Sequence, residues 1–369
     1  MPTLAPPADT PPTMFDLSQA PLLRQLTLSQ QVGLLQQFAL IQEADRLMQP
    51  FRTVLALQPK AHPGTERRAI TPLTPSTKRN NLFYKREDQT IIRAYKVRGA
   101  FTGMKRAMET LGETRFLAVS TGNHALGMLK AAELLRPQTV QIVVPTNASE
   151  VKLRQINSKI LGLRHKGVEA SIISLGDTFD EARNWALEQQ LTGDGTYVDP
   201  YNHPWTVAGQ GTIGLELYRQ LLPLLADRPE VSELVLICPI GGGGLLAGTA
   251  TGLSLASAYD ARFANIKLRY VGLRLQNQST KYGDAVRVKY IAPANEATMD
   301  ALAVERLKMS DEQMAHGMLG VYYDLHEKVE GPCAATWAWA QHRDDLAPTA
   351  SRLVVCVMSG GNVSHFPGH

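Results

Sequence analysis

The chain has 369 residues, a formal net charge of +4, and hydrophobic and charged contents of 44% and 20%, which predict a globular protein of about two domains. The positive charge is spread along the chain without runs of like charge, which argues against nucleic acid and anionic membranes as main partners. No apolar run reaches the roughly 18–20 residues of a membrane span, and the N-terminus lacks the basic start and apolar block of a signal peptide. With only three cysteines, the expected location is the cytoplasm.

A proline-rich start precedes a predicted helix. Five of the first 13 residues are prolines, and this segment is expected to be disordered or loosely draped. From about residue 22 to 48, apolar side chains recur at three- and four-residue steps and predict a helix with one apolar face, formed by Leu34, Phe38, Ile41, Ala44 and Met48. Ser29 is the candidate N-cap and Pro50 the candidate stop. That face covers either the chain's own core, the simpler interpretation, or a partner subunit.

From residue 67 onward, predicted strands and helices alternate. A turn-rich entry over 70–75 leads into the first strand, and most later strands are followed by a helix of ten or more residues. This alternation predicts an α/β fold of βαβ units, with parallel-type sheets flanked by helices. The predicted strands are 81–86, 116–120, 140–145, 170–174, 234–240, 267–273 and 352–358. The predicted helices are 101–111, 124–135, 149–161, 178–191, 209–225, 246–258, 311–327 and 334–343.

Four consecutive glycines stand between a buried strand and a helix: Gly241, Gly242, Gly243 and Gly244. Amides without side chains let an anion approach closely, and the following helix N-terminus adds partial positive charge, so a phosphate is the expected guest. Leu245 and Leu246 stand where a Walker loop needs Lys and Ser or Thr. Arg274 stands where a dinucleotide site needs an acidic residue. A purely structural glycine run is the alternative, at a cost in chain entropy.

Two further turns lie where a predicted strand ends. The first comprises Ser120, Thr121, Gly122, Asn123 and His124. Its amides and polar side chains predict a second anion cradle, and an ordinary helix N-cap is the equally weighted alternative. The second turn begins at Ser359, at the carboxyl end of a strand, where open α/β sheets bind ligands.

In their order along the chain, these segments resemble the threonine/serine dehydratase group of fold-type II pyridoxal-phosphate enzymes. The resemblance extends from about residue 71 to 363 and implies two open parallel-type sheets, preceded here by an N-terminal helical extension. It also implies pyridoxal 5′-phosphate as the cofactor. The segments that carry it are KRED at 85–88, YKVRGA at 95–100, STGNHA at 120–125, GQGT at 209–212, GGGG at 241–244 and SGGN at 359–362.

The resemblance implies a role for individual residues. Lys96 would bind the cofactor as a Schiff base and act as the base at the substrate α-carbon, a task that suits a lysine whose pKa is shifted by burial. Tyr95 would lie against the cofactor ring, and Asn123 would hydrogen-bond its phenolic oxygen. Ser359 would face the pyridine nitrogen, where a neutral hydroxyl does not keep that nitrogen protonated. Glu330 either lies near the ring or is a buried structural carboxylate.

The remaining implied roles concern phosphate and substrate. The phosphate would be held by Gly241, Gly242, Gly243, Gly244 and Leu245. The substrate carboxylate would be held by the loop of Ser120, Thr121, Gly122, Asn123 and His124. Thr121 stands where related racemases carry a serine whose hydroxyl works on the second face of the substrate. Its secondary hydroxyl is bulkier, and racemase activity is therefore not expected.

One departure from the family pattern concerns metal. Arg274 stands where many members have a glutamate that helps bind a divalent cation, and a guanidinium cannot be a ligand. The nine histidines show no paired metal spacing on a helix, so no metal site is predicted. The stretch 276–289 is unusually polar and is interpreted as an altered loop near the substrate entrance.

The predicted organisation has three parts. Residues 1–62 form an N-terminal extension, 63–114 together with 204–369 form a large cofactor-binding domain, and 115–203 form a small mobile domain that closes on the substrate. Because members of the resembled family are commonly dimers, a homodimer is expected.

The predicted activity is that of an ammonia-lyase. It would abstract the α-proton and eliminate the β-substituent of a small β-hydroxy L-amino acid such as threonine or serine, giving a 2-oxo acid and ammonia. One alternative is a β-replacement synthase, or a lyase acting on a modified amino acid in a specialised pathway. Another is a protein that binds the cofactor without catalysis, as a sensor or partner subunit.

Overall fold

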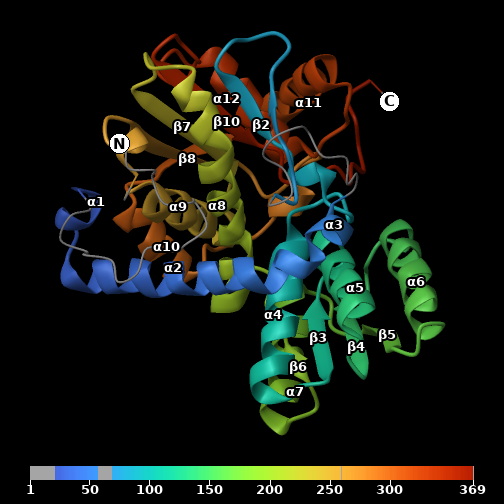
Figure 1. Ribbon diagram of the computed structural model, residues 1–369. Coiled ribbons are helices and arrows are strands. Elements are labelled where there is room, and N and C mark those ends of the chain that lie inside the picture. The colour runs from blue at the N-terminus through green and yellow to red at the C-terminus, as the bar shows by residue number, and fades with distance from the viewer. Residues whose placement is uncertain (1–20, 57–68, 259, 369) are drawn as a thin grey trace.

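The computed structural model describes residues 21–56, 69–258 and 260–368. The disorder expected of residues 1–13 therefore lies outside the described residues. The chain forms a larger and a smaller lobe, each built around its own sheet (Figure 1). This arrangement agrees with the predicted α/β fold with two sheets flanked by helices.

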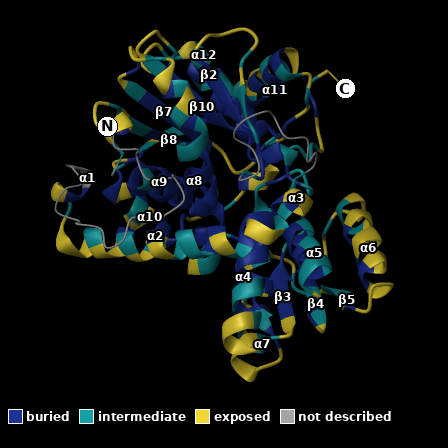
Figure 2. Ribbon diagram, in the orientation of Figure 1, coloured by how far each residue is buried: buried dark blue, intermediate teal, exposed yellow. Residues whose placement is uncertain are grey.

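The larger lobe holds a six-stranded sheet. Its strands run in the order β1 (Leu73–Pro75), β2 (Leu82–Lys85), β10 (Arg352–Val357), β7 (Glu233–Pro239), β8 (Lys267–Leu275) and β9 (Glu305–Met309). All neighbours pair in parallel except β1 with β2. The central strands β7 and β10 are buried almost throughout, as strands covered by helices on both faces must be (Figure 2).

Helices cover the two faces of this sheet. One face packs against α8 (Pro204–Ala226) and α9 (Gly244–Ser257), with α10 (Pro293–Ala301) beside α9. The other packs against α11 (Asp311–Leu325) and α12 (Gly331–His342). Alternate residues of β10 divide between the two cores, since Val355 belongs to the first and Cys356 to the second.

The smaller lobe holds a four-stranded parallel sheet. Its order is β5 (Glu169–Ser174), β4 (Thr139–Val144), β3 (Arg115–Val119) and β6 (Thr196–Tyr197). Side chains of β3 alternate between α7 (Phe179–Thr192) on one face and α5 (Asn123–Leu135) with α6 (Glu150–Arg164) on the other. Short 3₁₀ helices complete the connections, namely η2 (Gln49–Phe51), η4 (Glu87–Gln89), η5 (Ala261–Phe263) and η6 (Asp284–Val286).

The N-terminal helices lie along the larger lobe. The chain begins with α1 (Pro21–Arg24), α2 (Leu28–Met48) and α3 (Arg52–Leu55). The long helix α2 runs along α8, α9 and α10 and reaches α4 (Lys96–Leu111) (Figure 1). All five residues of the predicted apolar face are buried, so this helix covers the chain's own core. Thr27 rather than Ser29 is the N-cap, because its side chain and that of Gln30 form a reciprocal capping box.

Some elements differ from the predictions. The helix predicted from residue 101 begins five residues earlier, at Lys96. Gly99 lies inside it because α4 and α8 approach closely there, and a Cβ on Gly99 would lie 2.7 Å from the carbonyl oxygen of Thr206. The sequence pattern does not predict β1, β6, α10 or β9, which are too short or too polar for periodicity to reveal. Cys238 and Cys356, on the central strands β7 and β10, are buried.

In the described ranges, no helix combines the length and the apolar character needed to cross a membrane.

Candidate active site

Lys96 is the first residue of α4. Its Nζ donates a hydrogen bond to the carbonyl oxygen of Pro200 at 2.6 Å and lies 5.1 Å from the ring centre of Tyr95 and 5.9 Å from that of Tyr201. Burial lowers the pKa of Lys96 to about 8, although the negative charge of Asp199 opposes this shift. An appreciable fraction of this amine is therefore neutral near pH 7, and the neutral form is the one that reacts with an aldehyde.

The glycine run forms the turn between β7 and α9. Gly243 has a φ of 92°, a left-handed conformation that favours glycine, and a Cβ on Gly242 would lie 2.1 Å from the ring of Tyr201. Among the hydrogen bonds of the described residues, none uses an amide of the four glycines as donor. These amides and the N-terminus of α9 are free to bind an anion.

The second predicted anion turn leads from β3 into α5. Gly122 occupies the N-cap position and no side chain caps the helix, because the Ser120 hydroxyl accepts a hydrogen bond from the amide of Gly122 at 3.1 Å instead. The ordinary side-chain N-cap is therefore the wrong interpretation of this turn. Asn123, the first residue of α5, donates from Nδ2 to Oε1 of Glu330 and accepts at Oδ1 from Nδ2 of Asn362, both at 2.8 Å.

Glu330 lies at the start of α12, next to the turn that follows β10. Its amide donates to the carbonyl oxygen of Gly360 at 2.9 Å, and its carboxylate lies directly over Gly360, where a Cβ would approach it to 2.7 Å. Burial raises the pKa of Glu330 to about 7, against the opposing effect of the hydrogen bond from Asn123. The carboxyl group is thus a proton-exchanging group near neutral pH, bonded directly to Asn123.

Ser359 follows β10 and is buried. Its carbonyl oxygen accepts a hydrogen bond from the amide of Tyr95 at 3.1 Å, which places it beside the lysine segment. Because β7 and β10 pair in parallel, the glycine turn and Ser359 follow neighbouring strand ends at one edge of the sheet, where ligands bind in open α/β folds. Helix α5 packs against the lysine segment, since a Cβ on Gly127 would lie 3.1 Å from the carbonyl oxygen of Lys96.

The other predicted site residues differ in accessibility. Ser120, Thr121 and Gly122 are half-buried at the start of α5. His124 is buried, and its Nε2 lies 2.8 Å from the carbonyl oxygen of Val198. Burial and the charge of Lys96 lower the pKa of His124 to about 3, so its ring is neutral. Leu245, in the first turn of α9, is also buried, which leaves its backbone rather than its side chain for a phosphate.

Three residues at the site are not predicted by the sequence motifs. Pro200 and Tyr201 lie in the turn before α8 and contact Lys96 and the glycine turn. Asn295 on α10 donates from Nδ2 to the carbonyl oxygens of Tyr201 and Gly242, at 2.8 and 2.9 Å. The two prolines that frame the turn PYNHP at 200–204 are the signal that could have marked it as a rigid loop.

Arg274 lies in β8, and its guanidinium donates to the carbonyl oxygen of Lys289 at 3.2 Å. The described residues contain no cluster of three or more side chains suited to hold a metal ion. The stretch 276–289 lies against the glycine turn, since a Cβ on Gly241 would lie 3.3 Å from the Cα of Val286. Asp284 of the same stretch pairs with Lys152 of α6 at 3.1 Å. That stretch therefore contacts both lobes.

Residues 64–360 match the family described as "Pyridoxal-phosphate dependent enzyme". The chain belongs to this family. Its relatives include threonine dehydratases, which agrees with the family that the sequence motifs resemble. The chain is 30% identical over 248 residues to a threonine dehydratase of Nicotiana attenuata, a match that covers 66% of this chain and 37% of the relative. An L-threonine ammonia-lyase of Thermotoga maritima is 29% identical over 304 residues, which cover 76% of this chain and 67% of that enzyme.

Solved structures show the same fold. The processed form of threonine deaminase isoform 2 from Solanum lycopersicum superposes with a TM-score of 0.70 at 23% identity, covering 90% of this chain and 85% of that one. Maize serine racemase superposes with a TM-score of 0.67 at 23% identity, covering 89% and 94%. This pyridoxal-phosphate dependent enzyme spans less than half the length of the first curated relatives it matches, between 37% and 46% of them.

The residues present fit pyridoxal phosphate. Lys96 is a deeply placed amine with a lowered pKa, which suits the cofactor's aldehyde. The glycine amides have no partner among the described residues, which suits its phosphate. Asn123 presents an amide oriented by two hydrogen bonds, and Ser359 presents a neutral hydroxyl at the strand edge.

Proposed function

We propose that this protein is a pyridoxal-phosphate dependent ammonia-lyase that eliminates the β-substituent of a small β-hydroxy L-amino acid such as threonine or serine. The observation that carries the proposal is the buried amine of Lys96, whose pKa is lowered. It lies near Tyr201, which contacts the glycine turn, and its residue packs against helix α5, which follows the Asn123 turn. The threonine dehydratase and L-threonine ammonia-lyase names of its relatives support it.

The bound cofactor would supply carbanion stabilisation at the substrate α-carbon. Lys96 would hold the cofactor and move the α-proton, and its bond to Pro200 would keep Nζ within the site. The amides of Gly241, Gly242, Gly243, Gly244 and Leu245 would bind the phosphate. The amides of the turn before α5 would bind the substrate carboxylate, and Thr121 would present its hydroxyl to the second face. Ser359 would face the ring nitrogen without a formal charge, which suits β-elimination.

The organisation of the working enzyme is also proposed. Residues 63–114 and 204–369 would act as a large cofactor-binding domain, and residues 115–203 as a small domain that closes on the substrate, with residues 1–62 as an extension. We propose a homodimer in the cytoplasm, without a metal requirement at Arg274.

A substrate screen tests the activity. The purified holoenzyme, mixed with L-threonine or L-serine, should release 2-oxo acid and ammonia, and Lys96→Ala should abolish both products and the absorbance band of the bound cofactor. Lys130→Ala, which removes a surface lysine paired with Glu133, is the matched control and should behave like wild type. Holoenzyme that carries the cofactor but yields no 2-oxo acid from any small β-hydroxy amino acid would contradict the proposal.

One observation favours a second candidate. The polar stretch 276–289, to which Arg274 is bonded through Lys289, lies beside the glycine turn and contacts both lobes, a position from which it would admit a modified amino acid or a second substrate. A β-replacement synthase would then form a new amino acid when L-serine and a nucleophile are supplied together. Detection of that product in place of 2-oxo acid would select this function.

A further inference from the structure

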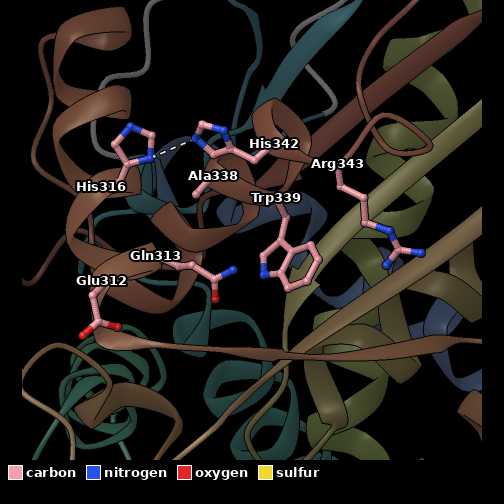
Figure 3. A pocket seen from close by; sticks show the side chains of 7 residues that line it. All are labelled: Glu312, Gln313, His316, Ala338, Trp339, His342 and Arg343. Atoms are coloured by element: carbon pink, nitrogen blue, oxygen red, sulfur yellow. Dashed lines mark hydrogen bonds between the residues drawn. The ribbon is translucent and has the colours of Figure 1, made fainter.

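A hollow of 280 Å³ lies on the outer side of the pair α11 and α12 (Figure 3). Polar and aromatic side chains line it, and no role in the proposed reaction involves them. The lining residues are Glu312, Gln313, His316, Ala338, Trp339, His342 and Arg343.

Two histidines meet in this hollow from different helices. Nδ1 of His316 and Nε2 of His342 lie 3.2 Å apart, and their ring centres are 4.9 Å apart. Two imidazole nitrogens bound to one tetrahedral zinc ion at about 2.0–2.1 Å each are separated by about 3.3 Å. In this structure the two nitrogens share a hydrogen bond at 3.2 Å (Figure 3). A metal ion would replace that bond at nearly the same separation of the nitrogens, once the rings rotate to point both at one centre.

The helices that carry these histidines form a rigid pair. A Cβ on Gly317 would lie 2.2 Å from the carbonyl oxygen of Ala334, and a Cβ on Gly320 would lie 2.2 Å from the ring of Trp337. The backbones of α11 and α12 are thus in direct contact beside the histidines. Sites built on packed helices hold their ligands more exactly in place than sites on loops.

The charges around the hollow also suit a cation. Arg343 is the one cationic residue of the lining, and its guanidinium points away from the two rings (Figure 3), held by Glu305 at 2.8 Å and by Asp345 at 2.6 Å. Glu312 precedes His316 by one helical turn, on the same face of α11. Its exposed carboxylate is directed toward Ser310 at the start of the helix, and rotation of its side chain turns it toward His316.

We propose that His316 and His342 bind a divalent transition-metal ion of the zinc class, with Glu312 as a third ligand and water completing the coordination. Imidazole suits zinc, copper and nickel, and a carboxylate is a common third ligand of zinc. Because the described residues hold no preassembled cluster of three ligands, Glu312 must move when the ion binds. The bound ion would link α11 to α12 and stabilise the fold. The sequence pattern does not predict this site, because its histidines are 26 residues apart on two helices.

Zinc titration of the holoenzyme tests the proposal. Wild type should bind one Zn²⁺ at this site. His316→Ala or His342→Ala should weaken that binding by at least the roughly ten- to hundredfold that loss of an outer-shell partner of a metal ligand costs. Glu312→Gln should weaken it less. Zn²⁺ should also raise the unfolding temperature of wild type and not that of either histidine variant. All three residues are exposed, so their substitution leaves the fold intact.

His165→Ala is the matched control, because it removes an exposed histidine on another helix end and should bind Zn²⁺ like wild type. Zinc held elsewhere, for example by the cofactor's phosphate, would bind equally to every variant. The proposed site is therefore measured by the difference in zinc binding between wild type and the two histidine variants. Equal zinc affinity and equal thermal shift in wild type, His316→Ala and His342→Ala would overturn the proposal.

Discussion

The bond between Glu330 and Asn123 determines how two site residues behave. Asn123 lies between Glu330 and Asn362, so its amide has one orientation, with Nδ2 toward the carboxylate and Oδ1 toward Asn362. Glu330 in turn has a pKa of about 7 because it is buried. The family resemblance left Glu330 as either a residue near the ring or a structural carboxylate. Its contact with Asn123 gives the first interpretation a physical basis.

Glu330 makes the stability of the apoprotein depend on pH. A carboxyl whose folded pKa is raised contributes stability that is present below its unfolded pKa of about 4.5 and lost as the pH rises through about 7. Between pH 5 and pH 8, the free energy of unfolding of wild type should therefore fall by about 2 kcal/mol more than that of Glu330→Gln. Urea denaturation of both proteins at the two pH values measures this difference.

The control is Glu133→Gln. The hydrogen bond from Lys166 lowers the pKa of Glu133 to about 2, despite partial burial. The contribution of Glu133 to the free energy of unfolding therefore changes only below about pH 4.5. This variant and wild type should respond equally between pH 5 and pH 8. A parallel fall for Glu330→Gln and wild type would show that Glu330 does not titrate in this range.

At the scale of elements, the site depends on short connections at strand ends. The turns after β7, β3 and β10 each leave a strand and meet around the first turn of α4. Tyr201 fills the space beside the glycine turn, where Gly242 has no side chain. The φ of Gly242 is not in the left-handed region, in contrast to that of Gly243. Contact with Tyr201, rather than backbone strain, is therefore what requires glycine at position 242.

Gly242→Ala should disturb the proposed phosphate turn. The added Cβ would lie 2.1 Å from the ring of Tyr201, and the turn must shift, at a cost of about 1–3 kcal/mol. Absorbance titration of the apoprotein with pyridoxal phosphate should show affinity weakened about tenfold or more. Gly162→Ala on α6, where nothing lies within 4 Å of the new Cβ, should leave cofactor binding unchanged. Equal cofactor affinity for both variants would mean that the turn does not hold the phosphate.

At the scale of the whole molecule, a buried ion network joins segments that are far apart in the chain. Arg98, two residues after Lys96, bonds Glu87 at 2.7 Å and Glu216 at 2.9 Å, and Lys85 bonds Glu216 at 2.7 Å. All four are fully buried. Burial alone would raise the pKa of Glu216, but the charges of Arg98 and Lys85 outweigh it and hold the pKa below its usual range. The network ties β2, α4 and α8 together behind the lysine.

Glu216→Gln should strongly destabilise the protein. It leaves Arg98 and Lys85 buried without a counter-charge, and breaking a buried pair costs about 3–5 kcal/mol. Glu305→Gln is the matched control, because Glu305 also pairs with two arginines, Arg269 and Arg343, but at the surface. Its loss should cost less than about 1 kcal/mol. Guanidinium denaturation gives both values, and similar losses for the two variants would contradict the role assigned to the network.

The sequence by itself determined most of the fold and the candidates for the reactive groups. Alternating apolar segments predicted the strands and most helices, since hydrophobic periodicity is a local property. Glycine runs at strand ends predicted the anion turns, because only local backbone freedom is involved. The roles of Lys96 and Ser359 came instead from the family resemblance and stay predictions, whereas β6, α10 and β9 lacked enough periodic residues for the sequence to predict them.

Only the tertiary structure decided which of these groups meet. Asn123 bonds Glu330 across 207 residues and Asn362 across 239, and Lys96 bonds Pro200 across 104. Such partners depend on strand order and on how closely helices pack, and no pattern within one segment records them. The same holds for the pKa values of Lys96 and Glu330, which are set by burial among residues from several elements.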